Sequence, residues 1–168
     1  MSRSIFKMKK RMAGILAAAV IILGLGFILY NQAIPNAYEP ADDEIVLHIR
    51  FDVGEDVGLL VYDYWADGRE YSGGISNADG SLIRHDSDNT VVWTQEELQM
   101  FSDPFELSMQ FRIITESVTP NYENEYPDDI TKYMEPISWE ARFGASYLIT
   151  ITGDQTHGYQ AVLSESSK

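Results

Sequence analysis

The chain has 168 residues, a formal net charge of −14 at pH 7 and no cysteine. The lack of cysteine excludes a disulfide framework and a lipid-modified cysteine near the N-terminus. Residues 31–168 hold seven Lys and Arg against all 26 Asp and Glu, which gives this part a net charge of −19. Such a surface repels phosphate backbones, so we exclude nucleic acid as a partner. Cationic ligands, divalent metals or basic proteins fit it better, and the alternative is that the acidic surface serves solubility alone.

Residues Met12–Tyr30 form an uncharged, mostly apolar stretch of 19 residues. As a helix it would be about 28 Å long, close to the thickness of the bilayer's hydrocarbon core. Five Lys and Arg precede it and none follows within residues 31–45, which predicts a single-pass protein of the cell membrane with a cytoplasmic N-terminus. A cleaved signal peptide is the alternative. It is disfavoured because the apolar part of such peptides is usually only about 7 to 15 residues long and no convincing cleavage site follows.

Four segments follow from this interpretation. We expect a basic cytoplasmic tail at residues 1–11, a transmembrane helix that acts as signal anchor at 12–30, a stalk at 31–43 and an extracytoplasmic domain at 44–168. Pro35 and Pro40 lie among small and polar residues of the stalk, which is typical of a linker.

Short alternating segments separated by turn residues dominate the domain, beginning with Glu44–Asp52. Asp67-Gly68 predicts a tight hairpin, and Asp79-Gly80 predicts a second one that continues a meander. We expect strands at residues 44–52, 57–66, 69–77, 81–85, 90–93, 105–113 and 137–143, the last broken or bulged at Gly144. Residues 145–152 and 159–163 are expected to form a final hairpin across residues 153–158. The segment at 105–113 alternates best and is the expected central strand.

Two short helices interrupt this pattern. Thr94 and Glu97 form an S/T-x-x-E capping box that predicts a helix over residues 95–101. Residues 127–134 open with Pro-Asp-Asp and space Ile130, Tyr133 and Met134 at i, i+3 and i+4, which predicts a second helix. Seven or eight short strands with two short helices indicate an all-β domain, most simply a single immunoglobulin-like or related β-sandwich, with a partly open barrel as the alternative.

The layout resembles the small β-sandwich modules of surface proteins from Gram-positive bacteria, in architecture alone. Pilin-type modules of this kind are often cross-linked by a Lys–Asn isopeptide bond. Such a bond is not expected here, because the lysines beyond the span are Lys132, in an expected helix, and Lys168 at the end. The lack of both cysteine and an N-x-Ser/Thr acceptor separately indicates a bacterial extracytoplasmic protein and not a eukaryotic surface receptor.

The sequence contains no strong catalytic motif. Its three histidines are far apart and match no metal-binding spacing, and no G-x-S-x-G elbow is present. We therefore expect a binding or interaction module for a protein or a surface polymer, and not an enzyme. The alternative is an extracytoplasmic enzyme that acts on a glycan or cell-wall polymer through a pair of carboxylates.

Two acidic clusters are candidates for calcium binding through oxygen ligands, although neither matches an EF-hand loop and no other cofactor is expected. Acidic residues are also common in turns and at helix N-termini, so a purely structural role is the competing interpretation. The candidate ligands are Asp86 and Asp88, with the neighbouring Asn89, and Glu123, Glu125, Asp128 and Asp129.

Aromatic residues on the strand at 57–66 offer a candidate ligand site. Tyr62 and Tyr64 share one face of this strand, while Trp65 lies on the opposite face with Leu59 and Val61. One set must leave the core unless both faces are covered. An exposed Tyr62–Tyr64 pair could stack on a sugar ring, and the alternative is that both tyrosines pack in the core.

Overall fold

The computed structural model describes residues 38–99, 102–118 and 126–165. The tail, the expected span Met12–Tyr30 and most of the stalk lie outside these residues. In the part of the chain that is described, no helix is long and apolar enough to cross a membrane. Residues Glu39–Lys168 form one compact unit, to which the rest of the description refers.

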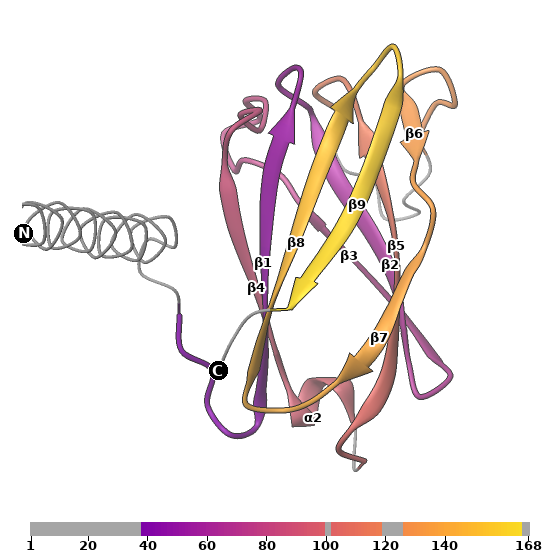
Figure 1. The fold of residues 1–168 in the computed structure, drawn as a ribbon. Coiled ribbons are helices and arrows are strands. Elements are labelled where there is room, and N and C mark those ends of the chain that lie inside the picture. The colour runs from indigo at the N-terminus through magenta and orange to yellow at the C-terminus, as the bar shows by residue number, and fades with distance from the viewer. Residues whose placement is uncertain (1–37, 100–101, 119–125, 166–168) are drawn as a thin grey trace, which may run out of the picture. The chain divides into compact units, whose positions relative to one another are not determined.

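The compact unit is an all-β domain of two sheets, which confirms the expected class (Figure 1). The four-stranded sheet has the order β4-β1-β8-β9, and the five-stranded sheet has the order β3-β2-β5, with both β6 and β7 paired to β5. The strands are β1 (Glu44–Val53), β2 (Leu59–Ala66), β3 (Arg69–Ile75), β4 (Asp88–Thr94), β5 (Phe105–Ile114), β6 (Thr131–Tyr133), β7 (Ile137–Ala141), β8 (Ala145–Asp154) and β9 (Gly158–Glu165).

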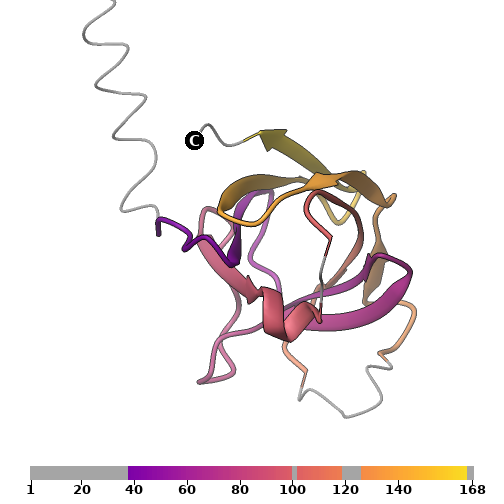
Figure 2. The same cartoon turned by 90° about the horizontal axis from the view of Figure 1, so that it is seen from below.

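The core lies between the sheets because the strands alternate as expected. On β1, Ile45, Leu47 and Ile49 are fully buried while Arg50 and Asp52 point outward. β5 repeats this pattern with Leu107, Met109 and Phe111, each at 0% exposure, and it is the central strand of its sheet. Seen along the strands, the two sheets surround this core and the short helix α2 (Gln95–Leu98) lies across one end (Figure 2).

Local turn and capping signals place several elements where we expected them. The β2–β3 hairpin turns through Asp67 (φ 50°) and Gly68 (φ 77°), the pair of positive φ angles that a type I′ turn requires. The capping box is formed, because the Thr94 hydroxyl accepts from the Glu97 N–H and the Glu97 carboxylate accepts from the Thr94 N–H. α2 is shorter than the expected helix over 95–101, since Gln99 adopts a left-handed conformation (φ 50°).

The meander expected after β3 is wrong. Gly80 makes the predicted turn (φ 74°), but the following segment pairs only through an isolated bridge of Ile83 to Val57. The chain then crosses to the other sheet, where β4 pairs with β1. Ile83 is the buried apolar anchor of this crossing, and β3 remains an edge strand that pairs with β2 alone.

The second expected helix is also wrong. Residues 128–130 form a single turn, after which β6 pairs with β5. Residues on and just after β5 hydrogen-bond with the backbone on both sides of β6. The Thr115 N–H donates to the Ile130 carbonyl at 2.9 Å, and the Met134 N–H donates to the Phe111 carbonyl at 2.9 Å. An i, i+3, i+4 spacing over five residues is too short to outweigh such pairing.

Nine strands are described in place of seven or eight: residues 81–85 form no strand, β6 is added, and Gly144 separates two strands of different sheets. The expected final hairpin of 145–152 with 159–163 is confirmed as the antiparallel pair β8–β9. Gly144 has φ 72°, and the chain passes from β7 in the five-stranded sheet to β8 in the four-stranded sheet. β8 then lies parallel to β1, with Ile45 opposite Ala145.

Candidate functional site

The face that β2 turns toward the core carries the two tyrosines. Tyr62 and Tyr64 are only 5% and 7% exposed, because β2 pairs with β5 so that Tyr62 faces Phe111 and Tyr64 faces Met109. The Tyr64 ring stacks on Trp93, with centroids 4.2 Å apart. Both rings are therefore enclosed by the core, which is the core-packing interpretation, and neither offers an exposed face on which a sugar ring could stack.

Trp65 takes the opposite position and points out of the five-stranded sheet. It is partly exposed and belongs to neither hydrophobic cluster of the domain. Its register partners are Ser108 on β5 and Glu70 on β3. Leu59 and Val61, the other members of the set on this face of β2, are buried in a second small cluster with Ile114. Both faces of β2 are therefore covered there, and of this set Trp65 is the partly exposed member.

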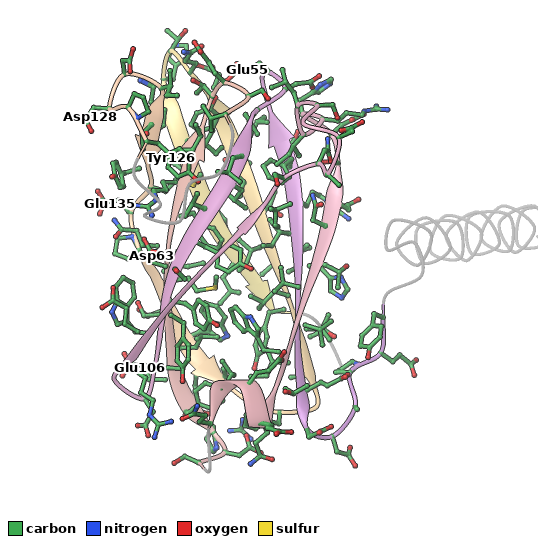
Figure 3. All side chains as sticks on the ribbon, turned by 180° about the vertical axis from the view of Figure 1, so that it is seen from behind. Glu55, Asp63, Glu106, Tyr126, Asp128 and Glu135 are labelled. Carbon is green, nitrogen blue, oxygen red and sulfur yellow. The ribbon has the colours of Figure 1, made fainter. Side chains whose placement is uncertain are left out.

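Polar side chains surround Trp65 on this surface, which we call the outer face. Figure 3 views the domain from this side, and Tyr126, Asp63 and Glu106 follow one another from the top of the view to the bottom. The register of the sheet assigns these side chains to the outer face: Asp63 and Trp65 of β2, Glu70 and Ser72 of β3, Glu106, Ser108, Gln110 and Arg112 of β5, Tyr133 of β6, and Ser138 and Glu140 of β7.

An ion pair lies at the centre of the outer face. Arg112 Nη2 is 3.6 Å from Asp63 Oδ2, and the two side chains are 16% and 25% exposed. The guanidinium carbon of Arg112 also lies 5.9 Å from the ring centroid of Tyr133, which is 60% exposed. Arg112 Nε is buried and has no hydrogen-bond partner among the described residues, so this side chain retains donor capacity.

Hydrogen bonds hold other polar groups of the outer face in place. Ser138 Oγ donates to Ser108 Oγ at 2.9 Å, and Gln110 Nε2 donates to the Met134 carbonyl at 3.4 Å. The side chains of Ser108 and Gln110 are partly exposed and that of Ser138 is exposed, and all three lie on paired strands. Polar groups positioned by a rigid sheet lose little conformational entropy when a ligand binds.

A shallow groove of about 260 Å³ adjoins the outer face at the β3 edge. Gly74 contributes no side chain there, and a Cβ at this position would lie 3.6 Å from Leu59 Cδ1. The lining residues are Leu59, Val61, Ser72, Gly73, Gly74, Ser76 and Tyr126. Its volume is below the roughly 300 to 1,000 Å³ of typical small-molecule pockets, so it suits one unit of an extended ligand.

The first acidic cluster differs from the expected turn. Asp88 and Asn89 belong to β4, whose pairing with β1 brings Asp88 Oδ1 to 2.8 Å from Arg50 Nε. Asp86 instead pairs with Arg84 at 2.8 Å. Both carboxylates therefore already contact a cation.

The second acidic cluster lies only partly within the described residues, since Glu123 and Glu125 fall outside them. Asp128 and Asp129 are exposed in the single turn before β6. No group of three or more His, Asp or Glu with metal-binding geometry occurs in the described ranges. Calcium binding at residues 123–129 stays a prediction.

The loops at the end of the domain opposite α2 are joined by hydrogen bonds. Glu55 Oε1 accepts from the Gln155 N–H at 2.8 Å and from the Tyr159 hydroxyl. Asp154 accepts from the N–H of His157, and contacts with the His157 side chain and backbone lower the pKa of Asp154. The Glu55 contacts connect the β1–β2 loop to the β8–β9 turn, and the Asp154–His157 contacts lie within that turn, so we assign both to loop stability.

Carboxylates on the described strands and loops are accessible to solvent. Thr131 is the buried polar residue of the described part, and no Asp or Glu there is buried. The general acid of a glycosidase is a carboxyl group whose pKa is raised by burial in an apolar pocket. No buried Asp or Glu that could meet this requirement occurs in the described part of the chain.

Comparison with known proteins gives no family: no protein-family model and no curated protein matches the chain. Solved structures that match the chain weakly include a non-hemolytic pneumolysin from Streptococcus pneumoniae (TM-score 0.39, 9% identity, 74% of this chain and 24% of that one). A second match is the membrane-binding domain of pneumolysin (TM-score 0.38, 10% identity, 74% of this chain and 99% of that one). A third is an intermedilysin mutant with human CD59 (TM-score 0.39, 11% identity, 74% of this chain and 24% of that one). This chain thus spans about a quarter of the full toxins, and likeness at these scores assigns neither their family nor their function.

Proposed function

We propose that this chain is a cell-membrane protein, anchored through Met12–Tyr30, whose extracytoplasmic domain binds a surface glycan. In this proposal the two sheets form a single β-sandwich of the immunoglobulin-like or a related kind, and the N-terminus is cytoplasmic. The observation that carries the binding function is the outward, partly exposed Trp65 among fixed polar groups on a rigid sheet.

Sugar rings have apolar C–H faces and a rim of hydroxyl groups, so they bind best where an aromatic ring lies beside polar donors and acceptors. Trp65 supplies the ring, and Gln110 and the Asp63–Arg112 pair supply the polar groups. These groups stand on adjacent strands of one face. A flat face with an adjoining groove suits an extended polymer better than a compact small molecule.

Binding of the full chain to an array of immobilised bacterial surface glycans tests this proposal. The chain is held in a non-ionic detergent without sugar groups, because a glycosidic detergent would compete. Trp65→Ala should weaken binding at least tenfold, whereas Val162→Ala, on the outer side of the four-stranded sheet and 50% exposed in the native chain, should leave it unchanged.

A second variant controls for the possibility that Trp65→Ala weakens binding by disturbing the fold. Ser72→Tyr adds bulk to the outer face at an exposed edge position and should also block binding, with far-UV circular dichroism reporting the fold. Equal binding by Trp65→Ala and the native chain would refute the proposal. Release of soluble sugar from a bound glycan would favour the enzymatic alternative instead.

A further inference from the structure

The outer face has a strong charge preference, because its register positions carry four carboxylates against one guanidinium, that of Arg112. Each of the six Lys and Arg side chains in the described residues contacts an oxygen acceptor of the domain itself. Four of them form ion pairs with Asp or Glu, while Arg69 donates to the Gln99 carbonyl and Lys132 to the Asp129 carbonyl. An anionic ligand would therefore meet uncompensated negative charge on this domain.

Carboxylates flank Trp65 on the sheet. Glu70 is its direct register partner on the edge strand β3, and residues so placed have Cβ atoms about 4.5 to 5.5 Å apart. Glu106 lies two residues from Ser108, the register partner of Trp65 on β5, whereas Asp63, two residues earlier on the same face of β2, is already paired with Arg112. Glu70 and Glu106 are exposed, so their charges face the same solvent as the indole ring.

An aromatic ring bordered by carboxylates has a defined ligand chemistry. The ring face attracts a cation through its quadrupole, and the carboxylates add direct charge attraction and accept N–H hydrogen bonds. An ammonium group satisfies both requirements. Neutral sugar hydroxyls use only the hydrogen bonds, and uronic acid or phosphate groups are repelled.

We infer that the glycan bound by the outer face is an amino-sugar polymer with free, protonated amines, whose ammonium groups lie against Trp65 between Glu70 and Glu106. This inference rests on the proposed glycan-binding function and narrows it to one class of ligand. The net charge of −19 on residues 31–168 favours the same class over longer distances.

Two oligosaccharides of equal length separate charge from ring shape. Glucosamine hexamers with free amines and the same hexamers with N-acetylated amines are titrated into the full chain in sugar-free detergent, at a pH where the amines are protonated. We expect the free-amine hexamer to bind at least tenfold more tightly, with tryptophan fluorescence as the readout. Added sodium chloride should reduce this preference, because the ions screen exposed charges.

A matched pair of variants assigns the preference to the outer face. Glu70→Gln should weaken binding of the free-amine hexamer by roughly three- to fivefold, about the strength of one exposed cation–π or ion contact, and leave the acetylated hexamer unaffected. Asp52→Asn removes an equally exposed charge from the outward side of β1 in the other sheet and should change neither affinity.

The possible outcomes separate a failure of this inference from a failure of the proposed glycan-binding function. Binding of neither hexamer in any condition, together with no binding to the glycan array, would refute the proposed function. Equal or tighter binding of the acetylated hexamer would refute the inference and leave the glycan-binding function standing. Equal effects of Glu70→Gln and Asp52→Asn would also refute it, because the preference would then come from the overall charge of the domain.

Discussion

Replacing Tyr64 tests the orientation of β2, on which the outer face depends. The side chain is 7% exposed and stacks with Trp93 at 4.2 Å and with Tyr71 at 5.0 Å between centroids. A buried tyrosine removes about 150 to 250 Å² from water, which at about 25 cal/mol per Å² corresponds to about 4 to 6 kcal/mol. After the alanine methyl is subtracted, Tyr64→Ala should lower the free energy of unfolding by about 3 to 5 kcal/mol, with up to about 1 kcal/mol more for each lost stack.

Two control variants isolate the ring packing. Tyr64→Phe keeps the ring and removes a hydroxyl that makes no hydrogen bond to a described residue, so its cost should stay below about 1 kcal/mol. Tyr133→Ala removes a ring that is 60% exposed on the outer face and should change stability by less than about 0.5 kcal/mol. Because the whole domain is expected to have only about 5 to 15 kcal/mol of stability, Tyr64→Ala should shift the unfolding midpoint strongly.

Urea unfolding of the full chain followed by far-UV circular dichroism is the suitable assay. Tryptophan fluorescence is avoided, since Trp93 contacts Tyr64 and its signal changes with the mutation itself. A loss below about 1 kcal/mol for Tyr64→Ala, or one no larger than for Tyr133→Ala, would contradict the inward orientation of Tyr64. It would also remove the basis for the outward position of Trp65, because the two residues are neighbours on one strand.

Two further predictions concern the β8–β9 turn and the pH dependence of stability. Gly153→Ala should destabilise far more than Gly158→Ala in the same urea assay: both have positive φ, but a Cβ at Gly153 meets the Gly158 carbonyl oxygen while one at Gly158 has open space. Equal losses would contradict the clash. Burial lowers the pKa of His48 from 6.5, against the opposing charge of Asp88, so the unfolded chain binds this proton more readily. Stability should therefore be greatest above pH 6.5 and fall as the pH drops through the lowered value, and His48→Gln should flatten this part of the pH profile of unfolding; an unchanged profile would contradict the assignment.

Local signals in the sequence were sufficient for most elements. Alternation predicted β1 and β5 because a half-buried strand needs apolar side chains at every second position. Asp67-Gly68 predicted its hairpin because few residue pairs tolerate two positive φ angles, and the Thr94–Glu97 box predicted the start of α2. In each case the determining interaction lies within a few residues along the chain.

Long-range pairing decided the remaining features. Residues 131–133 became a strand because β5 offered an edge to them, and Gly144 became a crossing between sheets because β1 offered a parallel edge to β8. The residues around these positions do not indicate with which distant strand each segment pairs. Local spacing alone therefore favoured a second helix and left open whether Gly144 breaks or bulges its strand.

The candidate site shows the same division most clearly. β2 carries apolar or aromatic residues on both faces, so its own pattern is compatible with either orientation. The pairing with β5 places Phe111 and Met109 beside Tyr62 and Tyr64, and the larger apolar area on that side turns them inward. The sequence by itself thus determined that a strand with two aromatic sets exists here, whereas the tertiary structure decided that Trp65 faces solvent and joined Asp63 to Arg112, 49 positions further along the chain.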